Sequence, residues 1–324
     1  LDTPTRMRIE AASRTLKRRA DMVQAWRAML LDLGQETPEH FVDWFAIERF
    51  AGRDRDIGMH RHWVDPSQPF AEAVLRQAHG VVITSATLRD NPPDTPDDWS
   101  AAEVRTGALH LALPAARVSL PSPFDYPAAT RILVVRDVNR NRPDQVAAAY
   151  RQLFLAAGGG GLGLFTAIQR LRAIHERIAA PLDEAGIPLL AQHVDAMDTG
   201  TLVDIFRAEE NTCLLGTDAV RDGVDVPGRS LRLIVFDRVP WPRPDILHRA
   251  RKQNFGKGYD DMIARLRLKQ AYGRLLRRAE DKGVFVMLDG MLPTRLTTAF
   301  PDGVEIQRLG LAEAIEQTRE FLRE

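Results

Sequence analysis

The fold of this chain is decided by residues 212–236, which read TCLLGTDAVRDGVDVPGRSLRLIVF. Both ends of this stretch are apolar, and its middle is rich in glycine and aspartate. Short, continuous apolar runs are typical of strands that are buried on both faces of a parallel sheet. The stretch therefore predicts two buried strands, at 212–216 and 231–236, joined through a loop in an α/β domain.

The same alternation continues on both sides of this stretch. Further strands are predicted at 131–135, 161–165 and 283–288, and helices at 143–156, 166–180, 199–209, 260–279 and 311–322. Repeated strand and helix alternation indicates an α/β domain with right-handed crossovers. The glycine run 158–161 ends a predicted helix and precedes a strand, so it is interpreted as a C-cap and turn rather than a phosphate loop.

The N-terminal part has a different pattern. Apolar residues such as Met22 and Trp26 recur at helical spacing, and Gly34 is placed to stop the helix. The predicted elements are a helix over 6–33, short extended pieces from Phe41, a helix over 69–75, a buried strand over 80–84 and a proline-rich loop over 91–98.

The bulk composition excludes several classes of protein. The chain has 324 residues, with 44 Lys and Arg balanced by 44 Asp and Glu, so no global charge indicates a nucleic-acid or membrane partner. No apolar run is long enough to span a bilayer. The N-terminal residues show no secretion signal, and the chain starts without methionine, which suggests a piece of something longer.

The chain contains a single cysteine, Cys213. One cysteine excludes an internal disulfide and any four-cysteine cluster within this chain. Because Cys213 lies in an apolar run, we expect it to be a buried small hydrophobic residue.

Three segments carry candidate chemistry, and the first is Thr84-Ser85-Ala86-Thr87-Leu88. Small hydroxyl residues at a strand end can hydrogen-bond neighbouring carboxylates without blocking a cleft. An ordinary strand-to-helix turn uses similar residues, so this segment alone does not decide between the two.

The second segment is Gly216–Gly228. Its glycines permit close approach of the backbone to a ligand, and Asp225 offers a carboxylate in a confined loop. An ordinary turn with a helix-capping aspartate explains the same residues equally well.

The third segment is Arg267–Arg278. If the predicted helix continues through it, Gln270, Arg274 and Arg277 share one helical face beside Gly273. A guanidinium matches phosphate oxygens and never titrates, so such a face suits phosphoryl transfer. A solvated basic helix face is the competing interpretation.

The order of these segments resembles a known family. Thr84–Leu88, Leu164–Ile168, Gly216–Gly228 and Gln270–Arg277 resemble helicase motifs III, IV, V and VI of superfamily 2. The segments Ser122–Tyr126 and Phe236–Asp245 are similar to stretches of XPD and DinG relatives. The chain thus resembles the C-terminal part of an XPD/DinG-like ATP-dependent DNA helicase, which implies a RecA-like parallel sheet flanked by helices, of the P-loop NTPase type.

The resemblance implies roles for nucleotide-site residues. Arg277 and Arg274 match the arginines that reach the γ-phosphate, with Arg277 as the expected finger, and Gln270 matches the polar start of the same motif. Gly223 and Asp225 match the part of motif V near the nucleotide. ATP and Mg would be shared with a first motor domain, and no metal ligand is assigned in this chain.

The resemblance also implies contacts with single-stranded DNA. Thr166 and Thr217 match positions that touch the DNA backbone, and Ser85 and Thr87 match the pair that couples hydrolysis to movement. Residues 229–282 hold 15 Lys or Arg and six Asp or Glu, together with several aromatic residues. Basic residues and stacking platforms suit unpaired bases, so Lys257 and Tyr259 are further candidates, whereas Tyr272 and Trp241 are expected in the core.

Expected features are missing from the sequence. No G-x-x-x-x-G-K-[ST] phosphate loop occurs, and Asp183-Glu184-Ala185-Gly186 imitates an acidic box but is interpreted as a surface turn. We therefore expect an arch remnant at 1–36, the end of a first motor domain at 37–98 and a second motor domain at 99–324. The missing N-terminal half would be a partner and would hold any iron–sulfur cluster.

These expectations define a function and its alternatives. The resemblance implies ATP-driven translocation on single-stranded DNA and duplex unwinding, in DNA repair or replication, in the cytoplasm or bacterial nucleoid. This chain alone would lack ATPase activity and would expose an apolar or edge-strand surface near Val81–Thr84. A non-catalytic single-strand-binding or partner-docking module is the alternative; an unrelated nucleotide enzyme would need its own phosphate loop.

Overall fold

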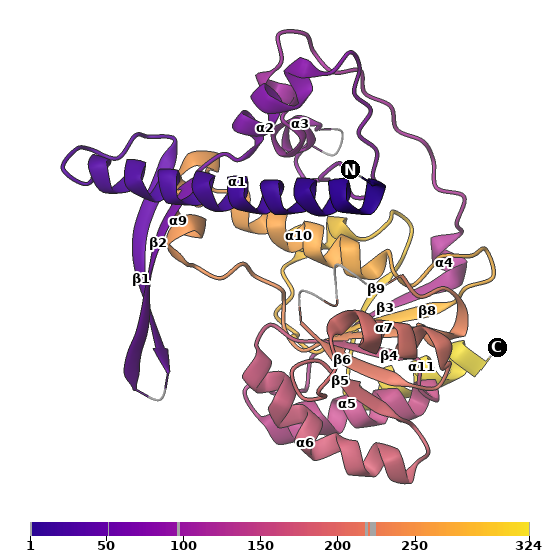
Figure 1. The fold of residues 1–324 in the computed structure, drawn as a ribbon. Helices are drawn as coiled ribbons and strands as arrows, with labels where there is room; N and C mark the ends of the chain where they lie inside the picture. Colours follow the sequence, from indigo (N-terminus) through magenta and orange to yellow (C-terminus); the bar gives the residue numbers. More distant parts are fainter. Residues whose placement is uncertain (1, 51, 96–97, 218–219, 221–224, 324) are drawn as a thin grey trace. The chain divides into compact units, whose positions relative to one another are not determined.

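The structure is a computed structural model, and it describes residues 2–50, 52–95, 98–217, 220 and 225–323 (Figure 1). The chain divides into two compact units. The first unit comprises Leu1–Val81, Thr106–Ala112 and Arg243–Tyr259. The second comprises Val82–Arg105, Leu113–Pro242 and Asp260–Glu324.

The second unit is built on a seven-stranded sheet. In spatial order its strands are β5 (Leu189–Ala191), β6 (Cys213–Gly216), β4 (Gly161–Leu164), β7 (Leu233–Phe236), β8 (Gly283–Met287), β3 (Thr130–Val135) and β9 (Ile306–Leu309). Every neighbouring pair is parallel. Because all strands run the same way, their carboxyl ends meet at one edge of the sheet.

Helices cover both faces of this sheet. The helices of the second unit are α3 (Ser100–Thr106, all but its last residue), α4 (Tyr126–Ala129), α5 (Pro143–Ala157), α6 (Ile168–Glu184), α7 (Thr199–Ala208), α10 (Tyr259–Tyr272, all but its first residue) and α11 (Leu311–Arg323), with 3₁₀ turns η3 (Gly228–Ser230) and η4 (Thr294–Ala299). One core packs α5, α6 and α11 against residues such as Leu133 and Val135. The other packs α7, α10 and η4 against Ile132 and Val134. This two-sided, parallel arrangement confirms the predicted RecA-like fold class.

The glycine run after α5 forms the predicted turn. Gly158 caps the helix at φ 67°, and Gly159 follows at φ 92°, a region that other residues rarely adopt. A Cβ on Gly159 would lie 2.1 Å from the carbonyl oxygen of Asn211. The glycines are therefore required by backbone geometry, and the prediction of a C-cap is confirmed.

The first unit combines a long helix and a hairpin. Its elements are α1 (Thr3–Asp32), β1 (Phe41–Phe50), β2 (Arg53–Trp63), α2 (Ser67–Ala73), the 3₁₀ turns η1 (Leu75–Gln77) and η2 (Ala108–His110), and α9 (Ile246–Phe255). Strands β1 and β2 pair antiparallel from Phe41 opposite Trp63 outward. Arg61 joins hairpin to helix, since it donates to Asp32 at 2.6 Å and to Asp43 at 2.7 and 2.8 Å.

The prediction of a strand at 80–84 is wrong. Residues 80–84 have no regular secondary structure, and the Val82 side chain is 90% exposed. A strand needs a neighbouring strand for its backbone hydrogen bonds, and the described residues provide none here. The expected apolar exposure is nevertheless confirmed, because Val81 and Ile83 are also exposed.

The helix predicted over 260–279 is also too long, because α10 ends at Tyr272. Beyond it, Leu275 and Leu276 turn inward and are buried. The Asp281 carboxylate accepts hydrogen bonds from the backbone N–H groups of Arg277 and Arg278, both at 2.8 Å. Residues 273–281 are therefore held by the burial of these two leucines and by the hydrogen bonds to Asp281, in place of the helical turns that were predicted.

Smaller predictions have mixed outcomes. Cys213 is fully buried, as expected, and burial raises the pKa of its thiol to about 12. The acidic stretch at 183–186 lies at the exposed end of α6, so the surface turn is confirmed. Tyr272 is in the core as predicted, whereas the prediction for Trp241 is wrong because this residue is 37% exposed. No helix in the described part of the chain is long and apolar enough to cross a membrane.

Candidate functional site

Two predicted DNA-contact residues lie at neighbouring strand ends. Leu164 of β4 is level with Gly216 of β6 and with Phe236 of β7 in the sheet register. Thr166 and Thr217 therefore leave the sheet at the same edge, on adjacent strands. This is the edge at which open parallel sheets bind ligands.

Thr217 is held by a buried glutamine that the sequence analysis did not single out. The Gln192 side-chain oxygen accepts from both the backbone N–H and the hydroxyl of Thr217, each at 2.9 Å. The Gln192 amide nitrogen in turn donates to Thr199 at 3.1 Å. Because Gln192 is only 5% exposed, it fixes the position of Thr217 from within the protein.

Two predicted nucleotide-site residues come together. The Nε of Arg277 lies 3.1 Å from a carboxylate oxygen of Asp225. Their side chains are 36% and 71% exposed, so the ion pair itself is worth about 0–1 kcal/mol. A weak, solvated pair leaves Arg277 able to exchange Asp225 for another anion. Gly223 and residues 221–224 as a whole lie outside the described residues.

Arg274 and Gln270 occupy different structural settings. Gln270 lies in the last turn of α10, whereas Arg274 and Arg277 follow the end of the helix. The prediction that all three share one helical face is therefore wrong. Gln270 and Arg274 are half-buried and Arg277 is exposed, so Arg277 is the most accessible of the three.

The hydroxyl pair of the first motif forms a local turn. The Ser85 hydroxyl accepts from the backbone N–H of Thr87 at 3.1 Å and lies 3.2 Å from the Thr87 hydroxyl. Such turns are typical of serine and threonine. Ser85 is exposed and Thr87 is half-buried.

A cluster of arginines and buried aspartates lies at the same strand ends. Arg170 donates to the carboxylate of Asp237 at 2.6 Å, and Arg140 donates to that of Asp289 at 2.5 Å. Both aspartates are almost fully buried, at 0% and 2% exposure. Arg238 joins them by donating to the backbone oxygen of Arg140 at 3.2 Å.

This strand-end cluster carries more positive than negative charge. It contains the guanidiniums of Arg140, Arg170 and Arg238 and the carboxylates of Asp237 and Asp289. Burial raises the pKa of Asp237 and lowers the pKa of Arg238, because it disfavours the charged form of each group. Opposite charges nearby act against this effect and stabilise both charged forms. A basic excess at the edge that holds Thr166 can attract phosphate oxygens.

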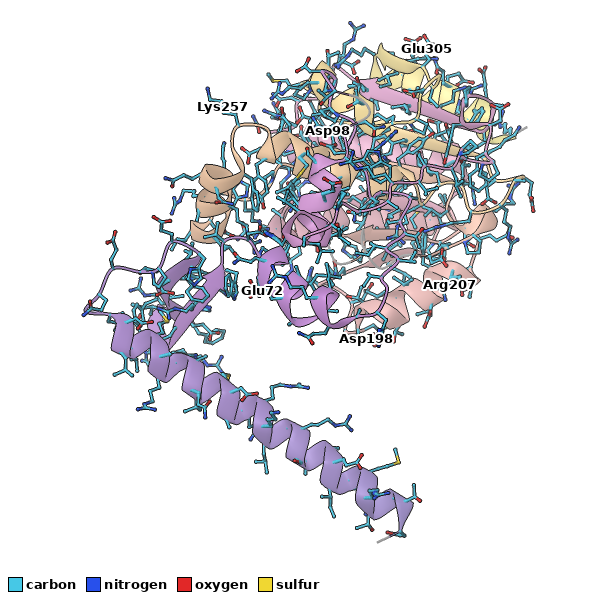
Figure 2. The ribbon with its side chains drawn as sticks, turned by 90° about the horizontal axis from the view of Figure 1, so that it is seen from above. Glu72, Asp98, Asp198, Arg207, Lys257 and Glu305 are labelled. Carbon is cyan, nitrogen blue, oxygen red and sulfur yellow. The ribbon has the colours of Figure 1, made fainter. Side chains whose placement is uncertain are left out.

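The remaining DNA candidates, Lys257 and Tyr259, belong to the first unit. Lys257 is exposed in the loop between α9 and α10, where Figure 2 shows it pointing away from the chain. The Tyr259 ring stacks on Phe255 at 5.3 Å and on His248 at 5.5 Å between ring centroids. These aromatic contacts hold Tyr259 in a small stack rather than on a free loop.

The residues fit one part of an ATP site. Arg277 and Arg274 can supply positive charge to a phosphate, but the sequence has no loop that would cradle a triphosphate. Among the described residues, no group of three or more His, Cys, Asp or Glu side chains is placed to hold a metal ion.

Comparisons with known proteins agree with these observations. A family described as the helicase C-terminal domain matches residues 150–305. The ATP-dependent helicase DinG of Mycobacterium tuberculosis H37Rv is 42% identical over 241 residues, which cover 70% of this chain and 34% of that protein. The ATP-dependent DNA helicase YoaA of Escherichia coli K12 is 32% identical over 238 residues, covering 70% and 35%.

The match to solved structures is weaker. A solved XPD helicase is 17% identical, at a TM-score of 0.43, over 56% of this chain and 35% of that one. The chain spans about a third of the length of the curated relatives it matches. Residues 150–305 thus match the helicase C-terminal domain family, and the chain is similar to part of the ATP-dependent helicases DinG and YoaA.

Proposed function

We propose that this chain is the second motor domain of an ATP-dependent DNA helicase. It would supply the arginine half of an ATP site and one wall of a channel for single-stranded DNA. The observation that carries the proposal is the ion pair between Asp225 and Arg277, which joins the motif V and motif VI segments at 3.1 Å.

The pairing suggests how Arg277 acts. Asp225 holds the guanidinium in place between turnovers, and the exposed pair is weak enough for a γ-phosphate to displace the carboxylate. The guanidinium then stabilises the charge that spreads over the transferring phosphoryl group. Arg274 and Gln270 would support the same phosphate. The phosphate loop and the Mg²⁺ ligands would belong to a first motor domain in the full-length protein.

The DNA-facing part of the proposal rests on the strand ends. Thr166 and Thr217, with the guanidinium of Arg238, would contact phosphates of the single strand. Such contacts read no sequence, which suits a protein that moves along DNA. Translocation in the 5′ to 3′ direction, a role in repair or replication and a cytoplasmic, nucleoid-associated location are the parts of this proposal that rest on the DinG resemblance alone.

The test compares two adjacent arginines in the full-length protein that contains this chain. Arg277→Ala should lower kcat for DNA-stimulated ATP hydrolysis by about a thousandfold, with a smaller change in KM for ATP. Arg278→Ala is the matched control, because Arg278 is also exposed and has the same backbone contact with Asp281. Hydrolysis at the wild-type rate in Arg277→Ala would sink the proposal.

A non-catalytic module that binds single-stranded DNA is the second candidate. It is favoured by the strand-end cluster, because the positive charges of this cluster could attract DNA phosphates without a bound nucleotide. In that case this chain would bind a single strand equally well with and without an ATP analogue, and Arg277→Ala would bind normally. We further expect the chain alone to show no ATPase activity; turnover that Arg277→Ala abolishes would contradict this.

A further inference from the structure

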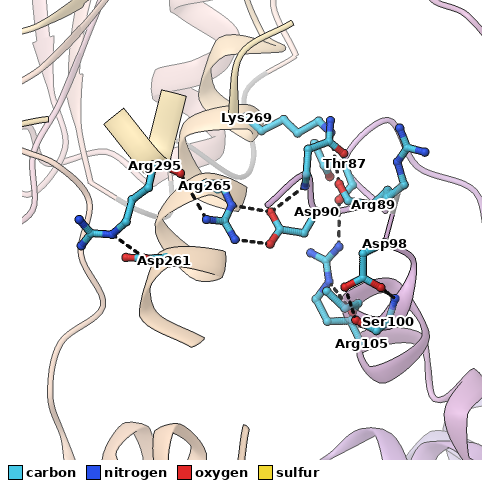
Figure 3. A network of polar contacts seen from close by, with 12 residues as sticks. Thr87, Arg89, Asp90, Asp98, Ser100, Arg105, Asp261, Arg265, Lys269 and Arg295 are labelled. Atoms are coloured by element: carbon cyan, nitrogen blue, oxygen red, sulfur yellow. Dashed lines mark hydrogen bonds and ion pairs between the residues drawn. The ribbon is translucent and has the colours of Figure 1, made fainter. Parts of the chain in front are cut away.

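The backbone that follows the Ser85–Thr87 turn is held by cationic side chains (Figure 3). The Arg105 guanidinium donates to the carbonyl oxygens of both Thr87, at 3.2 Å, and Leu88. The Lys269 ammonium donates to the carbonyl oxygen of Arg89 at 3.2 Å. Three successive carbonyl groups are thus taken up by side chains from α3 and α10, which leaves this short segment little freedom.

The next residue, Asp90, attaches the segment to α10 through a bidentate ion pair. Arg265 of α10 donates from Nε and Nη2 to the two carboxylate oxygens of Asp90, at 2.8 and 2.5 Å. The side chains are 7% and 9% exposed. A bidentate pair fixes the relative orientation of its two partners as well as their distance. It also joins residues 175 positions apart in the sequence.

Asp90 is the only carboxylate among the described side chains that line a small cavity here. The cations around it are Arg89, Arg105, Arg265 and Lys269. Burial and the nearby Arg89 lower the pKa of Lys269, as expected where positive charge is crowded. The cavity between these side chains measures about 10 Å³, room for at most one water molecule. The cavity therefore has no room for a solvated counterion beside the Asp90 carboxylate.

The held segment and the arginine loop share one helix. Lys269 and Arg265 lie on α10, which ends at Tyr272, just before Arg274 and Arg277. A helix transmits displacement along its axis because its backbone is internally bonded. Residues 87–90 are therefore attached to the helix that directly precedes the loop carrying the two arginines.

We propose that Asp90, Arg265, Lys269 and Arg105 form a strap that positions the Ser85–Thr87 turn against α10 and so links it to Arg274 and Arg277. This inference rests on the proposed helicase function. The strap residues are positioning residues: they hold the two motifs at a fixed separation and touch neither nucleotide nor DNA. Their contribution is to the coupling between ATP hydrolysis and strand separation.

The experiment measures base pairs unwound per ATP hydrolysed in the full-length protein. Asp90→Asn and Arg265→Gln should keep KM for ATP and kcat for hydrolysis within about threefold of wild type, while unwinding per ATP falls at least tenfold. Asp90→Glu, which keeps the charge but lengthens the side chain, should give an intermediate value and covers the case in which Asp90→Asn fails to fold.

A second ion pair of α10 supplies the matched control. Asp261 and Arg295 pair at 2.7 Å, with side chains 21% and 56% exposed. Asp261→Asn and Arg295→Gln should leave unwinding per ATP unchanged. A purely structural role for the strap would instead lower hydrolysis and unwinding in parallel, and that result overturns the inference.

The outcomes separate this inference from the proposed function. A wild-type protein without DNA-stimulated hydrolysis would overturn the proposed function and, with it, the coupling role. A wild type that unwinds normally, with unchanged unwinding per ATP in Asp90→Asn and Arg265→Gln, overturns the strap alone. Faster amide hydrogen exchange at Leu88 in Asp90→Asn than in Asp261→Asn should accompany the loss of coupling; equal exchange rates would count against the strap.

Discussion

The hydroxyl of Thr130, at the start of β3, lies 2.7 Å from the phenolic oxygen of Tyr272, the last residue of α10. Both side chains are buried. The contact fixes the end of α10 to the sheet, immediately before the loop that carries Arg274 and Arg277. Thr130 also donates to the backbone oxygen of Tyr126 at 2.7 Å, so its own hydrogen should go there and the phenol should donate to Thr130.

Tyr272→Phe removes this bond and should lower the free energy of unfolding by about 1 kcal/mol. Burial raises the pKa of Tyr272 from 10.0 to about 12. The stabilisation is therefore complete below pH 10 and is lost as pH rises through 12. Urea unfolding at pH 8 and near pH 11.5 should show a larger loss in wild type than in Tyr272→Phe. Parallel losses would contradict the assignment.

Gln192 provides a test of how Thr217 is positioned. Gln192→Leu removes the acceptor of both Thr217 hydrogen bonds and should destabilise the fold by about 1–2 kcal/mol. We expect affinity for single-stranded DNA to fall three- to tenfold in the full-length protein. Thr199→Val removes only the far partner of Gln192, so it should leave DNA affinity unchanged. Fluorescence anisotropy with labelled single-stranded DNA measures the affinity of each variant. Equal losses of affinity in Gln192→Leu and Thr199→Val would exclude a specific role for the hydrogen bonds between Gln192 and Thr217.

The strand-end cluster can be tested through salt dependence. Arg238 donates to the backbone of Arg140 and to Asn141, at 3.2 and 2.9 Å, so Arg238→Gln removes a charge without breaking either buried carboxylate pair. If Arg238 contacts one phosphate, the slope of log K against log salt should become shallower by about 0.7. Arg177→Gln on the exposed surface of α6 is the control. An unchanged slope in Arg238→Gln would remove this residue from the DNA contact.

Much of the fold could be predicted because its signals are local. The central strands are recognisable in the sequence as continuous apolar runs, and each lies within about two residues of its predicted bounds. The strands β5 and β9 were not predicted, because they lie at the two edges of the sheet, are short, and in β9 include Gln307 and Arg308. The prediction of a strand at 80–84 was wrong because an apolar pattern is not sufficient for a strand. A strand also needs a neighbouring strand to receive its backbone hydrogen bonds, and the local sequence does not reveal whether one is present.

The site was less accessible from sequence than the fold. Thr166 and Thr217 were named through the resemblance alone, whereas Asp225 and Arg277 were also singled out by their residue chemistry, and the geometry places Asp225 beside Arg277. The strand-end cluster was missed because its pairs join positions as far apart as 149 residues, and no local pattern marks them. One usable signal was that several predicted strands are followed within a few residues by a charged side chain.

The turn at 158–160 offers a clean comparison of backbone constraints. Gly159→Ala would place a Cβ 2.1 Å from the Asn211 oxygen at φ 92°, so we expect a loss of about 3 kcal/mol or more. Gly186 also has positive φ, at 72°, but a Cβ there would meet no described atom within 4 Å. Gly186→Ala should therefore lower the free energy of unfolding by only about 1 kcal/mol, because an alanine is less stable than a glycine in this left-handed backbone conformation. Similar losses from the two variants in urea unfolding would contradict the close contact at Gly159.

The buried thiol gives the last prediction. Cys213 is 0% exposed and packs in the core that includes Phe154, while burial raises its pKa to about 12. Because the thiolate is the reactive form and reagent cannot reach the sulfur, a disulfide reagent such as DTNB should react with the native chain at least a hundredfold more slowly than with the chain in urea. Cys213→Ser should show no reaction in either state. Rapid labelling of the native chain would mean that the sheet opens at β6, next to the strand that leads to Thr166.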